Sequence, residues 1–277
     1  KLEVVANVVK KVTELQLLNK VGYNALIGYL SNMKYVTDAG TDVVKAVKDL
    51  KNVNWSSDIN IYVEAAVEAL KLVEIGDGLS INADYFNLDP NQIQVVFDTL
   101  FATESFEKLL PIAVNVATNI VASSEKVKEK LGDLEIVIDT ANVDWKQDFT
   151  TLVSIYKVFQ DLDINSLDEM KDAMGLAKDI FAVDGKVGAV KVMLLELADM
   201  TLYGDVVVPV ADAVVANLIH SKAPNFEGIL DLTSLDEEAW KNDFSDLVAI
   251  VKNVYEICGF DFKLDSIDFN EVTGDCG

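Results

Sequence analysis

The stretches Trp55–Leu70, Trp145–Gln160 and Trp240–Tyr255 read WSSDINIYVEAAVEAL, WKQDFTTLVSIYKVFQ and WKNDFSDLVAIVKNVY, and they align without gaps. An aspartate follows each Trp by three residues, and apolar residues follow it by four, seven, eight and eleven. This spacing places the apolar side chains on one stripe of an α-helix. The three Trp are the only ones among 277 residues and lie about 90 and 95 residues apart. The sequence therefore predicts one helical unit of about 92 residues that occurs three times.

A second pair of similar stretches supports this division. LLPIAVNVATNIVASS begins at Leu109 and VVPVADAVVANLIHS begins at Val207, with a looser counterpart, NKVGYNALIGYLS, ending at Ser31. These stretches are too apolar for a surface helix, so each is expected to be the central helix of its unit. An amphipathic helix should open each unit, over Leu2–Leu17, Asn91–Leu110 and Lys186–Leu202, and the Trp helix should come third. The predicted fold class is all-α, with units 1–88, 89–182 and 183–277 stacked or fused into an elongated bundle.

The charge balance excludes several classes of partner. The chain has 46 Asp and Glu against 23 basic residues, all of them lysine, and its formal net charge is −23. A polyanion would be repelled, and the guanidinium fork that reads guanine is missing, so we expect no nucleic-acid binding. Apolar residues make up 51% of the chain, which is enough for a folded core. No run of about 18 apolar residues occurs, so no membrane insertion is expected.

The acidic charge is concentrated toward the carboxyl end. Residues 1–88 have nine lysines and eleven carboxylates, whereas residues 183–277 have six lysines and eighteen carboxylates. Contact with a cation or a cationic partner is one interpretation. A solvated acidic surface that keeps an apolar protein soluble is the more economical one, because such surfaces are common.

The Trp-x-x-Asp pattern has a functional and a structural interpretation. The Trp could be a platform for a sugar, with the Asp accepting hydroxyl hydrogen bonds. Alternatively the Trp packs between helices, and the Asp lies in the first helical turn, where a carboxylate complements the helix dipole. Recurrence in every unit favours the structural interpretation.

One loop resembles a calcium site in part. Asp161, Asp163 and Asn165 have the spacing of the first three ligands of a calcium-binding loop, and Asp172 is at position twelve. Ser166 replaces the glycine at position six, and Asp is shorter than the usual glutamate at position twelve. Calcium is therefore the one cofactor considered, with turn and capping roles as the alternative.

Nothing in the sequence singles out a catalytic group. His220 is the only imidazole, no GxSxG motif occurs, and no carboxylate pair stands out among the 46 acids. We therefore expect no enzyme.

Cys258 and Cys276 could close a short loop in an oxidising compartment or remain thiols. The chain begins at Lys1, which suggests a fragment or a processed product.

The threefold pattern, the strong acidity, the lack of arginine and the low cysteine content resemble helical-repeat segments of large bacterial cell-surface proteins. The resemblance implies an extracellular or cell-surface location and a structural or adhesive role as a spacer, stalk or self-assembling component. The expected partner is another protein or a second copy. Two alternatives remain: a carrier whose apolar helices, Leu109–Ala122 and Val206–Ile219, enclose a lipid-like ligand, and a secreted enzyme with an acidic cleft.

Overall fold

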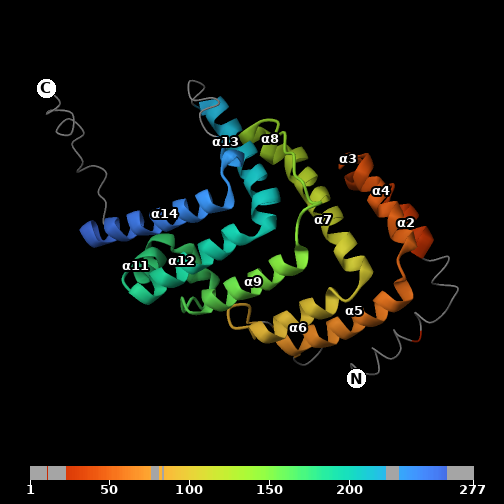
Figure 1. The fold of residues 1–277 in the computed structure, drawn as a ribbon, viewed down its shortest axis with the longest axis horizontal. Helices are drawn as coiled ribbons and strands as arrows, with labels where there is room; N and C mark the ends of the chain where they lie inside the picture. Colours follow the sequence, from red (N-terminus) through yellow and green to blue (C-terminus); the bar gives the residue numbers. More distant parts are fainter. Residues whose placement is uncertain (1–10, 12–22, 76–80, 83, 223–230, 261–277) are drawn as a thin grey trace.

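The computed structural model describes residues 11, 23–75, 81–82, 84–222 and 231–260, and over these residues the chain is mostly helical (Figure 1). The predicted all-α class is confirmed. Within the described ranges, one antiparallel pair of two-residue strands joins Glu74 to Asn82 and Ile75 to Ile81. The elements, in chain order, are α2 (Tyr23–Leu30), α3 (Lys34–Asp38), α4 (Thr41–Asp49), η2 (Leu50–Asn52), α5 (Trp55–Ala69), η3 (Leu70–Leu72), β1 (Glu74–Ile75), β2 (Ile81–Asn82), α6 (Pro90–Leu100), α7 (Glu104–Ser123), α8 (Glu125–Leu131), α9 (Trp145–Gln160), α10 (Leu167–Lys171), α11 (Ala173–Phe181), α12 (Asp184–Asp199), the π-helical turn η5 (Tyr203–Val207), α13 (Val208–Lys222), η7 (Leu232–Ser234) and α14 (Glu237–Cys258).

The three helices that contain the Trp residues begin where a short polar side chain caps them. Asn54 caps α5 and Asp144 caps α9 by accepting the backbone N–H of the residue three positions on, at 3.3 and 3.0 Å. Ser234 and Glu237 have the spacing of a capping box, which predicts a helix that starts at Ser234. This start is wrong: Asp236 caps α14 by accepting the N–H of Ala239 at 2.9 Å. Trp240 therefore lies one turn into its helix, whereas Trp55 and Trp145 are the first residues of theirs.

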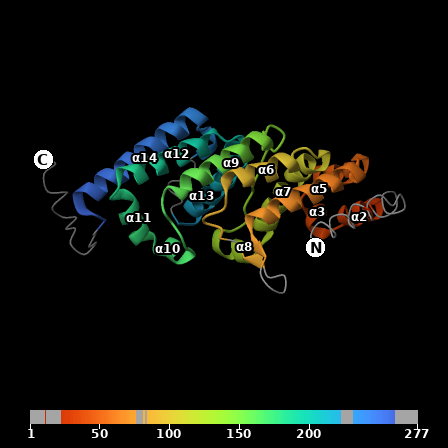
Figure 2. The same ribbon diagram turned by 90° about the horizontal axis from the view of Figure 1, so that it is seen from below.

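Five helices lie side by side across the molecule in the order α5, α6, α9, α12, α14 (Figures 1 and 2). Each packs against the next. The series thus alternates a Trp helix with α6 or α12, the helices in the regions where the second and third opening helices were expected. As a result α6 lies between α5 and α9, and α12 lies between α9 and α14. In both views α14 and α2 lie at opposite ends of the molecule.

The remaining long helices form a second group, in which α4 packs against α7, α7 against α8, and α8 against α13. The apolar helices α7 and α13 were expected to be central, and this is wrong. Several of their apolar side chains, among them Ile120, Val121 and Leu218, remain exposed. The row of amphipathic helices occupies the middle of the molecule because each of its inner members is packed on two sides.

Two expected helix boundaries are also wrong, and local chemistry explains both. The helix predicted over Asn91–Leu110 ends at Leu100, because Thr103 caps a new helix by accepting the N–H of Phe106 at 3.3 Å. The helix predicted over Lys186–Leu202 ends at Asp199, because Met200 has an extended backbone with ψ of 130° and Thr201 begins a new helical run. A π-helical turn precedes Pro209, which has no N–H to donate and would crowd the carbonyl four residues before it. The predicted helix Leu2–Leu17 lies outside the described residues.

The three Trp side chains are all half-buried, but their neighbours differ. Trp55 stacks on Tyr23 at 5.7 Å between ring centroids and donates its Nε1–H to the carbonyl of Leu50 at 2.8 Å. Trp240 packs edge-on against Tyr203 at 5.5 Å. Trp145 borders an open cleft. The three Trp residues occupy corresponding places in the sequence pattern, but their surroundings differ. A contact with a Tyr ring is shared by Trp55 and Trp240.

Candidate functional site

The first buried carboxylate of interest joins α5 to α7. Asp58, only 4% exposed, accepts the backbone N–H of Ser105 at 2.8 Å. Ser105 is the second residue of α7, where the helix leaves its N–H groups without a partner inside the helix. The Ser105 hydroxyl also forms a hydrogen bond with the hydroxyl of Tyr62, one turn further along α5, at 2.7 Å. We call this contact the first seam.

The second buried carboxylate makes the corresponding contact between α9 and the helical run that leads into α13. Asp148 is 1% exposed and accepts the N–H of Thr201 at 3.1 Å, the Thr201 hydroxyl at 2.8 Å and the N–H of Leu202 at 2.6 Å. The Thr201 hydroxyl oxygen in turn accepts the N–H of Asp144, the cap of α9, at 2.8 Å. This network is the second seam. In both seams the aspartate three residues after a Trp caps a helix that begins about 50 residues later in the chain.

The sequence placed these aspartates correctly and assigned their partners wrongly. Asp58 and Asp148 do lie in the first turns of α5 and α9. Their carboxylates, however, accept hydrogen bonds from the start of another helix, where the helix dipole also favours a negative charge. Sequence reasoning missed Thr103, Ser105 and Thr201. The available signal was the Thr that lies near the start of the second apolar helix in both regions.

Three carboxylates lie near one another at the second seam. The pKa of Asp205 is raised above its ordinary value, first by desolvation on burial and then by the negative charges of Asp139 and Asp148. The main chains of Asp139 and Asp205 are also joined, because the N–H of Asp139 donates to the carbonyl of Asp205 at 3.4 Å. That carbonyl lies four residues before Pro209, which cannot donate to it.

We expect Asp205→Asn to stabilise the protein at neutral pH. A carboxyl whose pKa is raised in the folded state stabilises the fold below its unfolded pKa, about 3.9, and that contribution is lost as the pH rises through the folded value. At pH 7 the ionised Asp205 is therefore unfavourable, and the amide should add about 0.5 kcal/mol to the free energy of unfolding. Urea denaturation at pH 7 and at pH 3 measures this. The gain should vanish at pH 3, where Asp205 is neutral as well, and a gain equal at both pH values would contradict the electrostatic explanation.

An open cleft of about 660 Å³ lies between α4, α7 and the link before α9. Apolar side chains line part of it, among them Val43, Ile112 and Trp145, and the carboxylates of Asp42, Glu107 and Asp139 lie at its border. The expected apolar helix Leu109–Ala122 contributes Pro111, Ile112 and Asn115 to this cleft, whereas Val206–Ile219 contributes nothing to it. A cleft of this volume could hold a small molecule.

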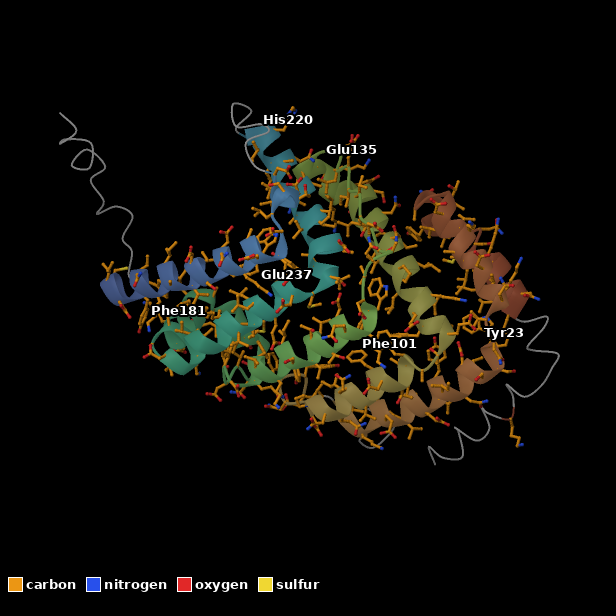
Figure 3. All side chains as sticks on the ribbon, viewed as in Figure 1. Tyr23, Phe101, Glu135, Phe181, His220 and Glu237 are labelled. Atoms are coloured by element: carbon orange, nitrogen blue, oxygen red, sulfur yellow. The ribbon has the colours of Figure 1, made fainter. Side chains whose placement is uncertain are left out.

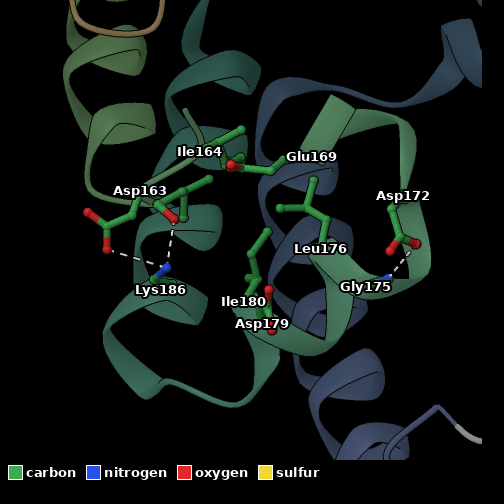
Figure 4. Close-up of a pocket in the computed structure, with 10 residues that line it drawn as sticks. Asp163, Ile164, Glu169, Asp172, Gly175, Leu176, Asp179, Ile180 and Lys186 are labelled. Carbon is green, nitrogen blue, oxygen red and sulfur yellow. Dashed lines mark hydrogen bonds and ion pairs between the residues drawn. The ribbon is translucent and has the colours of Figure 1, made fainter. Parts of the chain in front are cut away.

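The proposed calcium ligands are held in other interactions (Figure 4). Asp163 forms an ion pair with Lys186 at 3.4 Å, and Lys186 also donates to the carbonyl of Leu162 at 2.7 Å. Asp172 caps α11 by accepting the N–H of Gly175 at 3.0 Å. Asn165 donates its side-chain amide to the carbonyl of Asp163 at 2.8 Å, and Asp161 is exposed at the end of α9. Within the described part of the chain, no group of three or more His, Cys, Asp or Glu residues is placed to hold a metal ion.

Calcium binding stays a prediction that chelation can check. Because the lysine ammonium lies beside Asp163 and the Asp172 carboxylate is used as a cap, we expect the melting temperature to be the same in millimolar calcium and in excess EDTA. Asp172→Ala should cost about 1 kcal/mol through loss of the cap under both conditions. Differential scanning calorimetry measures both effects. A calcium-dependent rise that Asp172→Ala abolishes would establish the site.

His220 and Cys258 lie on two other helices, α13 and α14. His220 is exposed in the last turn of α13 (Figure 3). Cys258 contacts the carbonyl oxygen of Val254 through its sulfur at 3.1 Å, and Cys276, its possible partner, lies outside the described residues. Among the described helices one stretch, Tyr203–His220, is long and apolar enough to cross a membrane by length and composition. It includes Asp212, whose carboxylate accepts the N–H of Leu232 at 2.7 Å.

Comparison with known protein families, with curated proteins and with solved structures finds no match for this chain.

Proposed function

We propose that this protein is a structural repeat protein: a helical spacer, stalk or self-assembling component, without catalysis. It consists of three tandem units, residues 1–88, 89–182 and 183–277. In the second and third units an opening helix and an apolar second helix precede a Trp helix, and the opening helix expected in the first unit lies in a part of the chain that is not described apart from Lys11. The work of such a protein is done by the packing of one unit on the next, which sets length and direction.

The recurrence of the seam is the observation that supports this proposal. Asp58 caps the second helix of the following unit, and Asp148 does the same one unit later. The packing of α5 on α6 is likewise repeated by α9 on α12. A joint that is built twice from corresponding residues is what stacking of copied units requires.

The composition fits an extracellular or cell-surface location, which we propose on the resemblance to helical-repeat segments of bacterial surface proteins. A net charge of −23 keeps a chain with 51% apolar residues in solution. It also disfavours close approach to nucleic acid and to anionic membranes. The partner that remains is another protein or a further copy of the same units.

A carrier for a small apolar ligand is the second candidate, and the cleft beside α7 favours it. Its volume of about 660 Å³ is within the range of small-molecule sites, and Val43, Ile112 and Trp145 offer it an apolar wall. The acidic residues that also line the cleft, Asp42, Glu107 and Asp139, would either point away from a lipid-like ligand or bind a polar group of that ligand.

Native mass spectrometry of the freshly purified protein separates the two candidates. The structural proposal predicts that every peak equals the polypeptide mass or a multiple of it. A carrier predicts an additional bound mass that is lost when Ala46→Glu, at a half-buried residue that lines the cleft, places a charge in its wall while circular dichroism shows that the fold is retained. Val137→Glu, a change at an exposed residue outside this cleft, is the matched control.

A further inference from the structure

The last described helix has an apolar stripe that is open to solvent. On α14, Leu247 is 50% exposed, Ile250 is 58% exposed and Ile257 is 84% exposed. Asp243 is also exposed one turn before Leu247. The opposite face of α14, which includes Val248, is buried where α14 packs on α12. The four residues follow one another at helical spacing, so we call them the α14 stripe.

Three of these four positions are covered in the two other Trp helices; at the fourth, seven residues after the Trp, Leu152 of α9 is 37% exposed. Asp243, Ile250 and Ile257 follow their Trp by three, ten and seventeen residues. In α5 and the turn after it, Asp58 and Ala65 are buried and Leu72 is half-buried. In α9 and the turn after it, Asp148 and Leu162 are buried and Ile155 is half-buried.

The next unit provides most of the cover in both cases, and α11, which also packs against Leu162, belongs to the same unit as α9. The α5 positions are covered by α6 and the start of α7, and Ser105 reaches Asp58. Ile155 packs against Met200, Tyr203 and Val208, while Leu162 packs against residues of α11 and α12. An opening helix and the start of a second helix therefore form the surface that is complementary to this stripe.

We propose that the α14 stripe binds the amino-terminal unit, residues 1–88, of a second copy of this chain. This inference rests on the proposed function, because it extends the seam between units to a contact between molecules. Residues 1–88 have the predicted order of helices that covers α5 and α9. Their described part, from α2 onward, lies at the end of the molecule opposite α14 (Figures 1 and 2).

Charge favours this head-to-tail occupant over a tail-to-tail dimer. The third unit has eighteen carboxylates and six lysines, so pairing two third units would bring two strongly acidic surfaces together. The first unit has nine lysines and eleven carboxylates and is close to neutral. In the resulting contact, Asp243 accepts N–H groups at the start of a helix of the second copy, as Asp58 and Asp148 do within the chain. A contact between unlike surfaces at opposite ends gives open chains of molecules.

Analytical ultracentrifugation over a range of protein concentrations tests the proposal. The unmodified protein is expected to associate reversibly, and Ile250→Lys with Ile257→Lys is expected to weaken the association at least tenfold. Each lysine lowers the net negative charge, so general charge repulsion cannot explain a loss of association. Val137→Lys is the matched control, because Val137 is also 84% exposed and lies outside the stripe. It should leave association unchanged.

Crosslinking of a mixture of isotopically labelled and unlabelled copies establishes the orientation. The expected intermolecular links join residues 1–88 of one copy to residues 237–260 of another. Links between two third units would overturn the proposal, as would association that persists in the double variant. A protein that stays monomeric at every concentration would also overturn the proposal, whatever covers the stripe in the monomer.

These failures are distinct from failure of the proposed function. If the unmodified protein is monomeric while Asp148→Ala destabilises it and Asp243→Ala does not, the stacking of units within the chain remains supported. Only the contact between copies is then lost. If association persists in the double variant, self-assembly stands and this interface is wrong.

Discussion

Asp148→Ala is expected to lower the free energy of unfolding by about 3 kcal/mol, because each hydrogen bond to a charged group contributes about 1.5–3 kcal/mol and such effects are not fully additive. The substitution removes the acceptor of three hydrogen bonds at a site that is 1% exposed. The N–H groups of Thr201 and Leu202 would then be left without a partner inside the protein. For a chain of this length the corresponding fall in melting temperature is about 6–12 °C.

Asp243→Ala is the matched control for this substitution. Both aspartates lie three residues after a Trp on a helix, so the change in helix propensity is similar in the two variants. Asp243 is exposed, and its replacement should change the free energy of unfolding by less than about 0.5 kcal/mol. Urea denaturation at a concentration where the protein is monomeric measures both. Equal effects in the two variants would show that the second seam contributes no stability.

Leu50→Ala is expected to have an effect of similar size, about 3 kcal/mol. Leu50 is 2% exposed and packs in a cluster with Ile27, Val47 and Ile112, which joins the α2–α4 region to α7. Truncation removes buried methyl groups and leaves a cavity, while the backbone carbonyl that accepts the Trp55 Nε1–H remains. The control is Leu26→Ala, the same change at a residue that is 51% exposed, with an expected effect below about 0.5 kcal/mol.

The distribution of the Leu50→Ala effect tests the division into units. In stacked repeats each unit is stabilised mainly by itself and by its neighbours, so opening can be local. Hydrogen exchange should accelerate in α2–α5 and stay unchanged in α14. Equal acceleration along the whole chain would show a single cooperative body and would contradict a unit boundary near residue 88.

Helical class and the positions of the Trp helices could be predicted because their determinants are local. The apolar spacing after Trp55, Trp145 and Trp240 marks the helical period, and Asp144 caps its helix by accepting the N–H of Gln147. The predicted apolar stripe is only partly buried, because Leu152 and Leu247, seven residues after their Trp, are 37% and 50% exposed. The start of α14 was misplaced by two residues for a related reason: Ser234 and Asp236 are both good caps, and the sequence alone did not distinguish them. The central position expected for α7 and α13 was wrong because hydrophobicity measures how much surface should be buried, and not which helix provides the cover.

The sequence by itself determined that this protein is helical and acidic and that a Trp-x-x-Asp pattern occurs three times in it, since periodicity, charge and spacing can be read along the chain. Only the tertiary structure decided what the aspartates of the Trp helices do. The groups that Asp58 and Asp148 bind lie 47 and 53 to 54 residues away in the chain. Except for the Thr201 hydroxyl, they are backbone N–H groups, which every residue except proline has, so a Thr near the helix start is the one side-chain signal that marks them. Their selection depends on which helix start is brought against each carboxylate when the helices pack.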